Sequence, residues 1–84
     1  MTHSLLMCRS LTYAQRTARS LERGGISGYI QRAPQGASNR GCGYCVKIRS
    51  TQLQAAIALL RGDGLPPERV LQQAGDREFQ EVAF

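Results

Sequence analysis

The spacing of apolar and polar positions predicts a strand followed by a helix at the start of the chain. Residues Ser4 to Cys8 form a short, nearly continuous apolar run, which is typical of a central strand. Ser10 then offers an N-cap hydroxyl for a helix. Gly24-Gly25 ends this helix, because glycine accepts the left-handed closing conformation. The apolar face of the helix is expected to carry Leu11, Ala14, Ala18 and Leu21, opposite Arg16, Arg19 and Arg23.

Alternation of side chains predicts two strands in the middle of the chain. The first covers Gly28 to Arg32, and the second covers Tyr44 to Arg49. Between them, residues 33–43 contain proline, glycine, serine and asparagine and are expected to form a flexible loop that carries a thiol. The second strand should place Tyr44, Val46 and Ile48 on one face and Cys45, Lys47 and Arg49 on the other.

The last third of the chain predicts a second helix and a closing strand. Ser50 or Thr51 is expected to cap the helix, and Gly62-Asp63-Gly64 to end it. Pro66-Pro67 then stands at a plausible helix start, so a short helical turn is expected over Glu68–Gln73. The segment Glu78–Phe84 reads as an edge strand with Val82 and Phe84 pointing inward. The inward positions of the second helix are Leu53, Ala56, Ile57 and Leu60.

This order of elements predicts an α+β domain with the ferredoxin-like βαββαβ arrangement. Four antiparallel strands would carry two helices on one face, with the first and third strands as central neighbours. A chain of 84 residues suffices for a single domain, residues 1–84, with a thin core. The small core weighs against a stand-alone enzyme and favours a carrier, an adaptor or a binding module.

Charge and composition bear on the expected binding partners and cellular location. The net charge is +5, and Lys47 is the single lysine beside ten arginines. Arginine forks suit phosphate and carboxylate groups, but no block of consecutive basic residues occurs, so a solvated surface is the preferred interpretation. No apolar stretch approaches the length needed to span a bilayer, and the N-terminus lacks a basic leader region. Together with an odd number of cysteines, these features predict a cytoplasmic protein without a membrane partner.

The chemically distinctive motif is Cys42-Gly43-Tyr44-Cys45 at the start of the third strand. Two thiols at this spacing can form a disulfide, share a metal ion, or lower each other's pKa. A structural zinc site needs four ligands, and the chain adds only Cys8 and His3, so a site within one chain is not expected, whereas one shared across a dimer stays open. Neither a resident metal nor a cofactor is predicted.

The predicted pairing of the first and third strands would gather the cysteines at one edge of the sheet. It brings Cys8 and Arg9 near Cys45, next to the helix that Ser10 caps. A helix N-terminus with Arg9 and Arg40 would favour a thiolate there. The alternative is that Cys8 is a small buried hydrophobe and Cys45 an ordinary strand residue. Packing explains Cys42 least well, because Gly41 and Gly43 flank it.

Several of these segments resemble a family of small bacterial proteins, the putative selenium/sulfur carrier protein-like family. The similarity lies in Ser10-Leu11-Thr12-Tyr13-Ala14, in Leu21-Glu22-Arg23-Gly24-Gly25-Ile26, in Pro34 and in Cys42-Gly43. The resemblance implies a carrier that passes persulfide sulfur or selenium between enzymes, with Cys42 on the family's Cys-Gly position. Cys45 departs from the commoner pattern, and a second thiol there could attack a persulfide on Cys42.

The carrier hypothesis implies partner enzymes, and the residues also allow two other functions. A carrier would work with sulfur- or selenium-transfer enzymes, such as a donor of the cysteine desulfurase type. The first alternative is a small thiol-redox or zinc-binding module that uses both Cys42 and Cys45. The second is a basic regulatory or nucleic-acid-binding module with Tyr29 or Tyr44 as stacking residues, which ranks last because no aromatic-rich basic strand occurs. An exposed edge strand is compatible with a homodimer.

Overall fold

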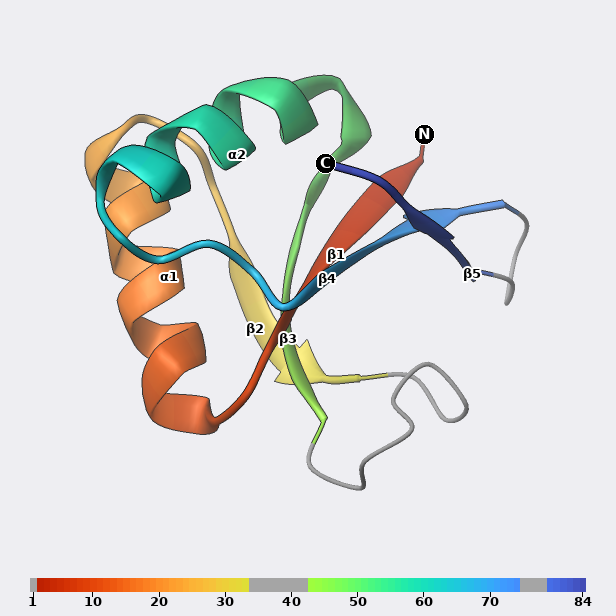
Figure 1. Ribbon diagram of the computed structural model, residues 1–84, viewed down its shortest axis with the longest axis horizontal. Helices are drawn as coiled ribbons and strands as arrows, with labels where there is room; N and C mark the ends of the chain where they lie inside the picture. Colours follow the sequence, from red (N-terminus) through yellow and green to blue (C-terminus); the bar gives the residue numbers. More distant parts are fainter. Residues whose placement is uncertain (1, 34–42, 75–78) are drawn as a thin grey trace.

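The computed structural model describes residues 2–33, 43–74 and 79–84 (Figure 1). Every strand pairing is antiparallel, and the strand order is β2-β3-β1-β4-β5. The predicted α+β class with an antiparallel sheet is confirmed. The prediction of four strands is wrong, because the described chain forms five, and the ferredoxin-like assignment stays a prediction. In chain order the elements are β1 (His3–Cys8), α1 (Leu11–Arg23), β2 (Tyr29–Arg32), β3 (Tyr44–Arg49), the 3-10 helix η1 (Ser50–Gln52), α2 (Leu53–Gly62), β4 (Arg69–Gln73) and β5 (Phe79–Val82).

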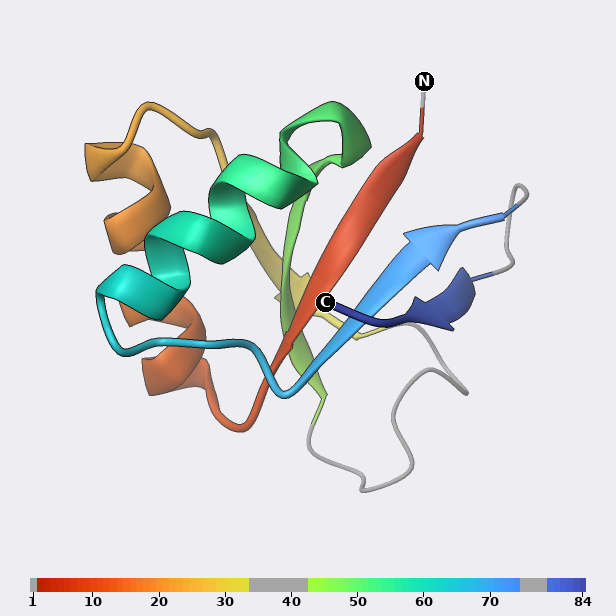
Figure 2. The same cartoon turned by 45° about the horizontal axis from the view of Figure 1, so that its top comes forward.

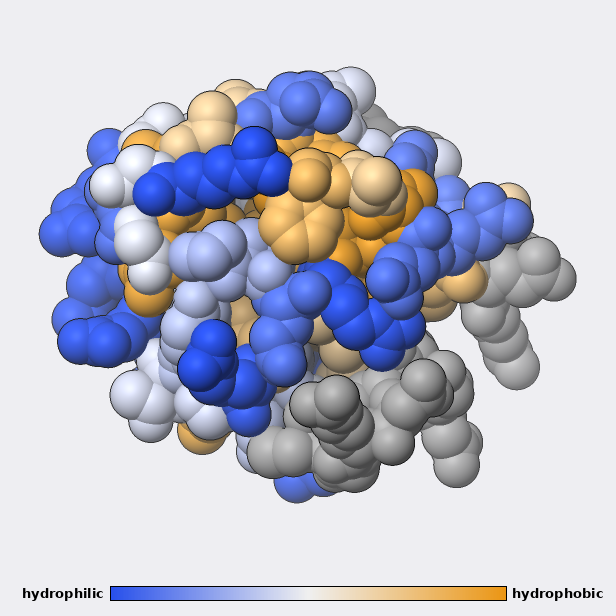
Figure 3. Space-filling model, in the orientation of Figure 1, coloured by the Kyte–Doolittle hydropathy of each residue, from blue (hydrophilic) through white to orange (hydrophobic). Residues whose placement is uncertain are grey.

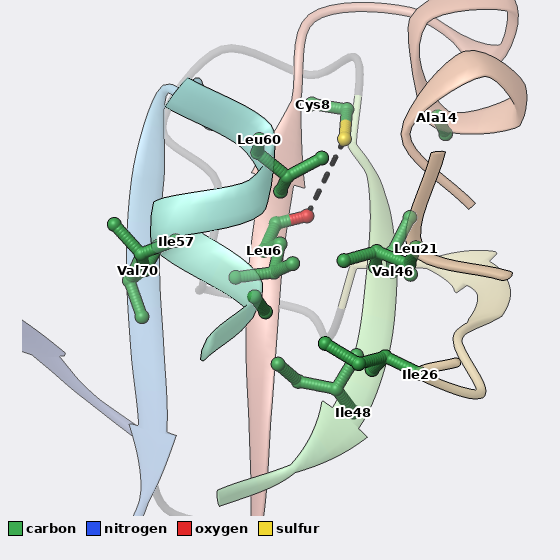
Figure 4. Packing of buried hydrophobic residues seen from close by; sticks show 11 residues of the cluster. Leu6, Cys8, Ala14, Leu21, Ile26, Val46, Ile48, Ile57, Leu60 and Val70 are labelled. Carbon is green, nitrogen blue, oxygen red and sulfur yellow. Dashed lines mark hydrogen bonds between the residues drawn. The ribbon is translucent and has the colours of Figure 1, made fainter. Parts of the chain in front are cut away.

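The two α-helices lie on the same face of the sheet (Figures 1 and 2). They enclose the main core, to which α1 contributes Leu21 and α2 contributes Leu60, against Leu6 and Val46 of the central strands (Figure 4). Ser10 caps α1 as predicted, since its side-chain oxygen accepts a hydrogen bond from the backbone N–H of Tyr13. Neither α-helix of the described chain has the length and apolarity that crossing a bilayer takes.

The connection from α1 to β2 depends on two glycines. Gly25 has a φ of +82°, in the left-handed region that turns the chain away from the helix. At Gly28 the backbone passes so close to the core that a Cβ would lie 2.7 Å from Cγ1 of Val46. These glycines let the chain leave α1 and pass close to the core before it enters β2 beside β3.

The opposite face of the sheet carries a second, smaller apolar cluster. Its buried members are Leu5 and Met7 of β1, Cys45 of β3 and Leu71 of β4. Alternation along each strand explains the division, because neighbours in a strand point to opposite faces. The predicted division of β3 is confirmed, since Val46 and Ile48 lie in the main core and Cys45 does not.

Two local predictions around α2 and β4 are wrong. The segment after Pro66-Pro67 forms β4 instead of a helical turn, because it pairs with the second edge of β1, with Leu71 opposite Leu5. Neither Ser50 nor Thr51 caps α2 through its side chain. η1 precedes this helix, and the Ser50 hydroxyl forms a 2.8 Å hydrogen bond with that of Ser4 instead.

The C-terminal strand is confirmed as an edge strand, with one difference in its facing. Val82 packs against the main core as predicted, but Phe84 is 45% exposed, so its predicted inward position is wrong. Its ring lies under the guanidinium of Arg61, with 5.7 Å between the guanidinium carbon and the ring centroid. Figure 3 shows apolar side chains gathered around this end of the chain between hydrophilic ones.

Candidate functional site

The connection between β2 and β3 is closed at its base by backbone pairing. The N–H of Ala33 donates to the carbonyl oxygen of Gly43 at 2.7 Å, and Arg32 pairs with Tyr44 in the adjoining register. Gly43 is therefore held at the start of β3, at one end of the sheet. The predicted site residues Arg40, Gly41 and Cys42, and with them most of the predicted thiol loop over 33–43, lie outside the described residues.

The end of β1 lies beside this base, as predicted. Cys8 pairs with Tyr44 and Met7 with Cys45 in the antiparallel ladder. Immediately after Cys8, the chain turns through Arg9 and Ser10 into α1. The N-terminal end of α1 and the first residues of β3 thus share one edge of the molecule (Figure 1).

Two of the described arginines at this edge stack on tyrosine rings. The guanidinium of Arg9 lies 5.0 Å from the ring centroid of Tyr13, and that of Arg32 lies 5.8 Å from that of Tyr44. Stacking of this kind holds a guanidinium over a ring while leaving its N–H groups free to donate. Glu68 also reaches this edge, since its backbone N–H donates to the carbonyl of Met7 at 2.9 Å. Among the described residues, this edge therefore brings Arg9 and Arg32 together with Glu68.

Cys8 is buried in the main core, with a relative exposure of 2%. Its thiol donates to the carbonyl oxygen of Leu6 at 3.4 Å, as Figure 4 shows, and to the hydroxyl of Thr17 at 3.9 Å. Burial raises the pKa of Cys8 from 9.0 to about 11; the hydrogen bond with Thr17 lowers it, and the negative charge of Glu68 raises it. This environment supports the alternative in which Cys8 is a small buried hydrophobic residue.

Cys45 is completely buried on the opposite face of the sheet, among the second apolar cluster. Burial raises the pKa of its thiol from 9.0 to about 11. The hydrogen bond with Gln31 and the charge of Lys47 act in the other direction, and Cys8 adds to the rise. In this conformation Cys45 is a protonated thiol at neutral pH, without access to solvent.

The expected meeting of thiols in one electropositive corner does not occur for Cys8 and Cys45. Their backbones are neighbours, but their side chains point to opposite faces, and both pKa values move upward instead of downward. Desolvation outweighs the hydrogen bonds with Thr17 and Gln31 and the positive charge of Lys47, because both sulfurs are removed from water. Both are free thiols.

The described residues bring together no metal-ligand cluster, and they leave one of the two proposed stacking tyrosines exposed. In this part of the chain, no three His, Cys, Asp or Glu side chains come together as metal ligands. The zinc alternative involves Cys42 and so stays a prediction. Of the proposed stacking residues, Tyr44 packs against the core, whereas Tyr29 is 68% exposed.

Two partners of the buried thiols were not foreseen from sequence. Thr17 lies on α1 and Gln31 on β2, and each hydrogen-bonds a cysteine from another element. Helical spacing does place Thr17 next to Ala14 and Leu21 on the inward side of α1, so its burial could have been inferred. No sequence signal links Gln31 to Cys45, because their pairing depends on the register of two strands.

Comparison with known proteins supplies a family. A family model described as "Putative Se/S carrier protein-like" matches residues 3–72, which include the Cys42-Gly43 dipeptide. No curated protein and no solved structure matches the chain. Because the matched segment spans β1 through most of β4, the resemblance noted in the sequence is confirmed, and the chain belongs to the Se/S carrier protein-like family.

Proposed function

We propose that this protein carries sulfur or selenium on Cys42 and passes it between transfer enzymes. The observation that carries the proposal is the family match, which includes Cys42-Gly43. The described structure supports it by weakening the other candidates among the three cysteines. Cys8 and Cys45 are buried, and each has a pKa of about 11, so neither is a ready nucleophile at neutral pH.

The loading step is a thiolate exchange. The thiolate of Cys42 attacks the terminal sulfur of a persulfide on the donor enzyme. A new bond forms between Sγ of Cys42 and that sulfur, the sulfur–sulfur bond of the donor breaks, and the donor cysteine leaves as a thiolate. Delivery repeats the step, with an acceptor thiolate attacking and Cys42 leaving. No outside oxidant or reductant is required, and a selenium atom in the terminal position would follow the same course.

The base of the β2–β3 connection supplies features that suit this chemistry. Cys42 directly precedes Gly43, whose carbonyl is held by Ala33. Arg9 and Arg32 lie at the same edge and could stabilise the anionic persulfide, because guanidinium groups pair with delocalised anions. A carrier needs no acid or base of its own, since the donor and acceptor enzymes provide them.

The thiol-redox alternative makes a different demand on the fold. A disulfide between Cys42 and Cys45, or attack by Cys45 on a persulfide, requires the Cys45 sulfur to leave the apolar cluster and to lose its proton. We therefore assign transfer to Cys42 alone. Participation of Cys45 is the alternative hypothesis, and the variants below test it.

The test is intact-mass measurement after incubation with a cysteine desulfurase and cysteine. We expect one added sulfur atom on the wild-type protein, removed by a thiol reductant. Cys42→Ser should remain unlabelled, whereas the matched variants Cys8→Ala and Cys45→Ala should load as the wild type does. Equal loading of Cys42→Ser, with circular dichroism showing an intact fold, would refute the proposal. A mass lower by two hydrogens, formed in air and abolished by Cys45→Ala, would favour the redox alternative.

A further inference from the structure

A polar groove lies at the other end of β3 from Gly43. Its volume is about 390 Å³, and its walls come from β1, β2, β3, η1 and the link between α1 and β2. Figure 1 shows the start of β1 and the turn into α2 at this end, away from the first residues of β3. None of the lining residues is acidic: they are His3, Gly25, Ser27, Tyr29, Lys47, Ile48, Arg49 and Gln52.

Two of these residues place fixed positive charges on one face of one strand. Lys47 and Arg49 are two positions apart on β3, so both project from the face opposite the helices. His3 is directly opposite Arg49 on β1, and Tyr29 is directly opposite Lys47 on β2. Among the described residues, neither Lys47 nor Arg49 has an ion-pair partner.

This concentration of charge is unfavourable in the unliganded protein. Like charges on neighbouring positions of a sheet repel, and no carboxylate lines the groove to offset them. The other described ion pairs lie elsewhere, where Asp63 meets Arg23 and Glu81 meets Arg69. An anion bound between Lys47 and Arg49 would turn the repulsion into attraction for both.

We propose that this groove binds a phosphate group, with Lys47 and Arg49 as its cationic ligands. A guanidinium fork beside an ammonium matches the geometry and the double negative charge of a phosphate better than that of a single carboxylate. Ser27 and Gln52 add polar side chains that can donate hydrogen bonds. The exposed ring of Tyr29 at the rim offers a flat surface for a planar group attached to the phosphate.

The site is separate from the proposed carrier thiol. From Gly43 to Arg49 the chain advances six residues in extended conformation, which corresponds to about 20 Å. Phosphate binding therefore does not depend on the reactivity of Cys42, and either proposal can fail without the other.

The experiment is a titration of the ¹⁵N-labelled protein at low salt, first with inorganic phosphate and then with adenosine monophosphate. We expect chemical-shift changes concentrated at Lys47, Arg49 and Gln52 in both series. Arg49→Gln and Lys47→Gln should each weaken binding by about tenfold or more, as expected for loss of a charge-assisted contact. The matched control Arg16→Gln removes an exposed charge from α1, outside the groove, and should leave affinity within about twofold.

The two ligands distinguish the possible sources of the phosphate. Tighter binding of the nucleotide than of phosphate, lost in Tyr29→Leu, would identify a phosphate attached to a planar ring. Equal binding of the two would identify the free ion or a phosphate on another scaffold. Absence of shifts at the groove, or equal weakening by Arg16→Gln and Arg49→Gln, would overturn the proposal, because the attraction would then come from the net charge alone.

Discussion

Cys8 and Cys45 lie on neighbouring strands, one position out of register, and their side chains point to opposite faces of the sheet. Each is enclosed by a different apolar cluster, and the pKa of each thiol is raised to about 11. The pleat of the sheet therefore separates two sulfurs that the strand pairing brings together. Two of the predictions below follow from this arrangement.

The two buried thiols should resist alkylation in the folded protein. In a Cys42→Ser variant, only Cys8 and Cys45 remain, and at pH 7 a thiol with a pKa of about 11 is ionised on the order of one part in ten thousand. We expect very slow iodoacetamide labelling at pH 7, followed by intact mass, and fast labelling in denaturant. Rapid labelling of the native variant would show that one of these sulfurs is accessible and acidic.

The same thiols should make the protein less stable in alkali. Their pKa values are higher in the folded state than the ordinary 9.0, so between pH 9 and 11 the unfolded state loses protons that the folded state keeps. Their stabilising effect is full below pH 9 and is lost as pH rises toward 11, by up to about 2 to 3 kcal/mol per thiol. Urea unfolding at pH 8 and pH 10.5 measures the loss.

A Cys45→Ala variant provides the control for this alkaline effect. Other groups that ionise above pH 9 are present in both proteins, so the difference between the two pH profiles isolates the thiol. The variant should lose less stability between pH 8 and pH 10.5 than the wild type. Parallel profiles would show that folding does not raise the pKa of Cys45.

Gly28 should not tolerate a methyl group. A Cβ at this position would lie 2.7 Å from Cγ1 of Val46 and 3.2 Å from Cδ1 of Leu21, both of which are packed in the core. We expect Gly28→Ala to lower the free energy of unfolding by about 1 to 3 kcal/mol, as overpacking does. Chemical denaturation measures the change.

Gly62 offers a matched control for that substitution. It is the last residue of α2, and a Cβ there meets no atom within 4 Å. Gly62→Ala should be neutral or stabilising by up to about 1 kcal/mol, because alanine favours the helix. Similar losses at both positions would contradict the close approach of β2 to the core.

Asp63 should stabilise the packing of the two helices mainly through Ser20. The buried hydroxyl of Ser20 on α1 donates to the carboxylate of Asp63, which follows α2 directly. Loss of this charged hydrogen bond in Ser20→Ala should cost about 1.5 to 3 kcal/mol of unfolding free energy. Arg23 also faces Asp63, at 3.9 Å, but its side chain is 72% exposed, so Arg23→Ala should cost less than about 1 kcal/mol. Thermal or urea unfolding of both variants gives the comparison, and a larger loss for Arg23→Ala would reverse this assignment.

Local sequence patterns determined β1, α1 and β3 and the division of side chains between the two faces of β3. On α1 the predicted inward position of Leu11 is wrong, because this first residue of the helix is 42% exposed. Ser10 and Gly24-Gly25 bounded α1 as predicted, because capping hydroxyls and glycines act within a few residues of where they stand. Alternation over Tyr44–Arg49 likewise separated Val46 from Cys45, because a strand has a period of two wherever it lies.

Only the tertiary structure decided the secondary structure of Arg69–Gln73 and the environment of the cysteines. A segment of five residues is too short to form a stable helix on its own. It becomes a strand because its backbone pairs with the edge of β1 that β3 leaves free. Alternation could place Cys45 on a face, but its burial depends on Leu5, Met7 and Leu71, which reach it from other strands. The grouping of His3, Lys47 and Arg49 around one groove arises in the same way, because cross-strand register is a property of the assembled sheet and of no single segment.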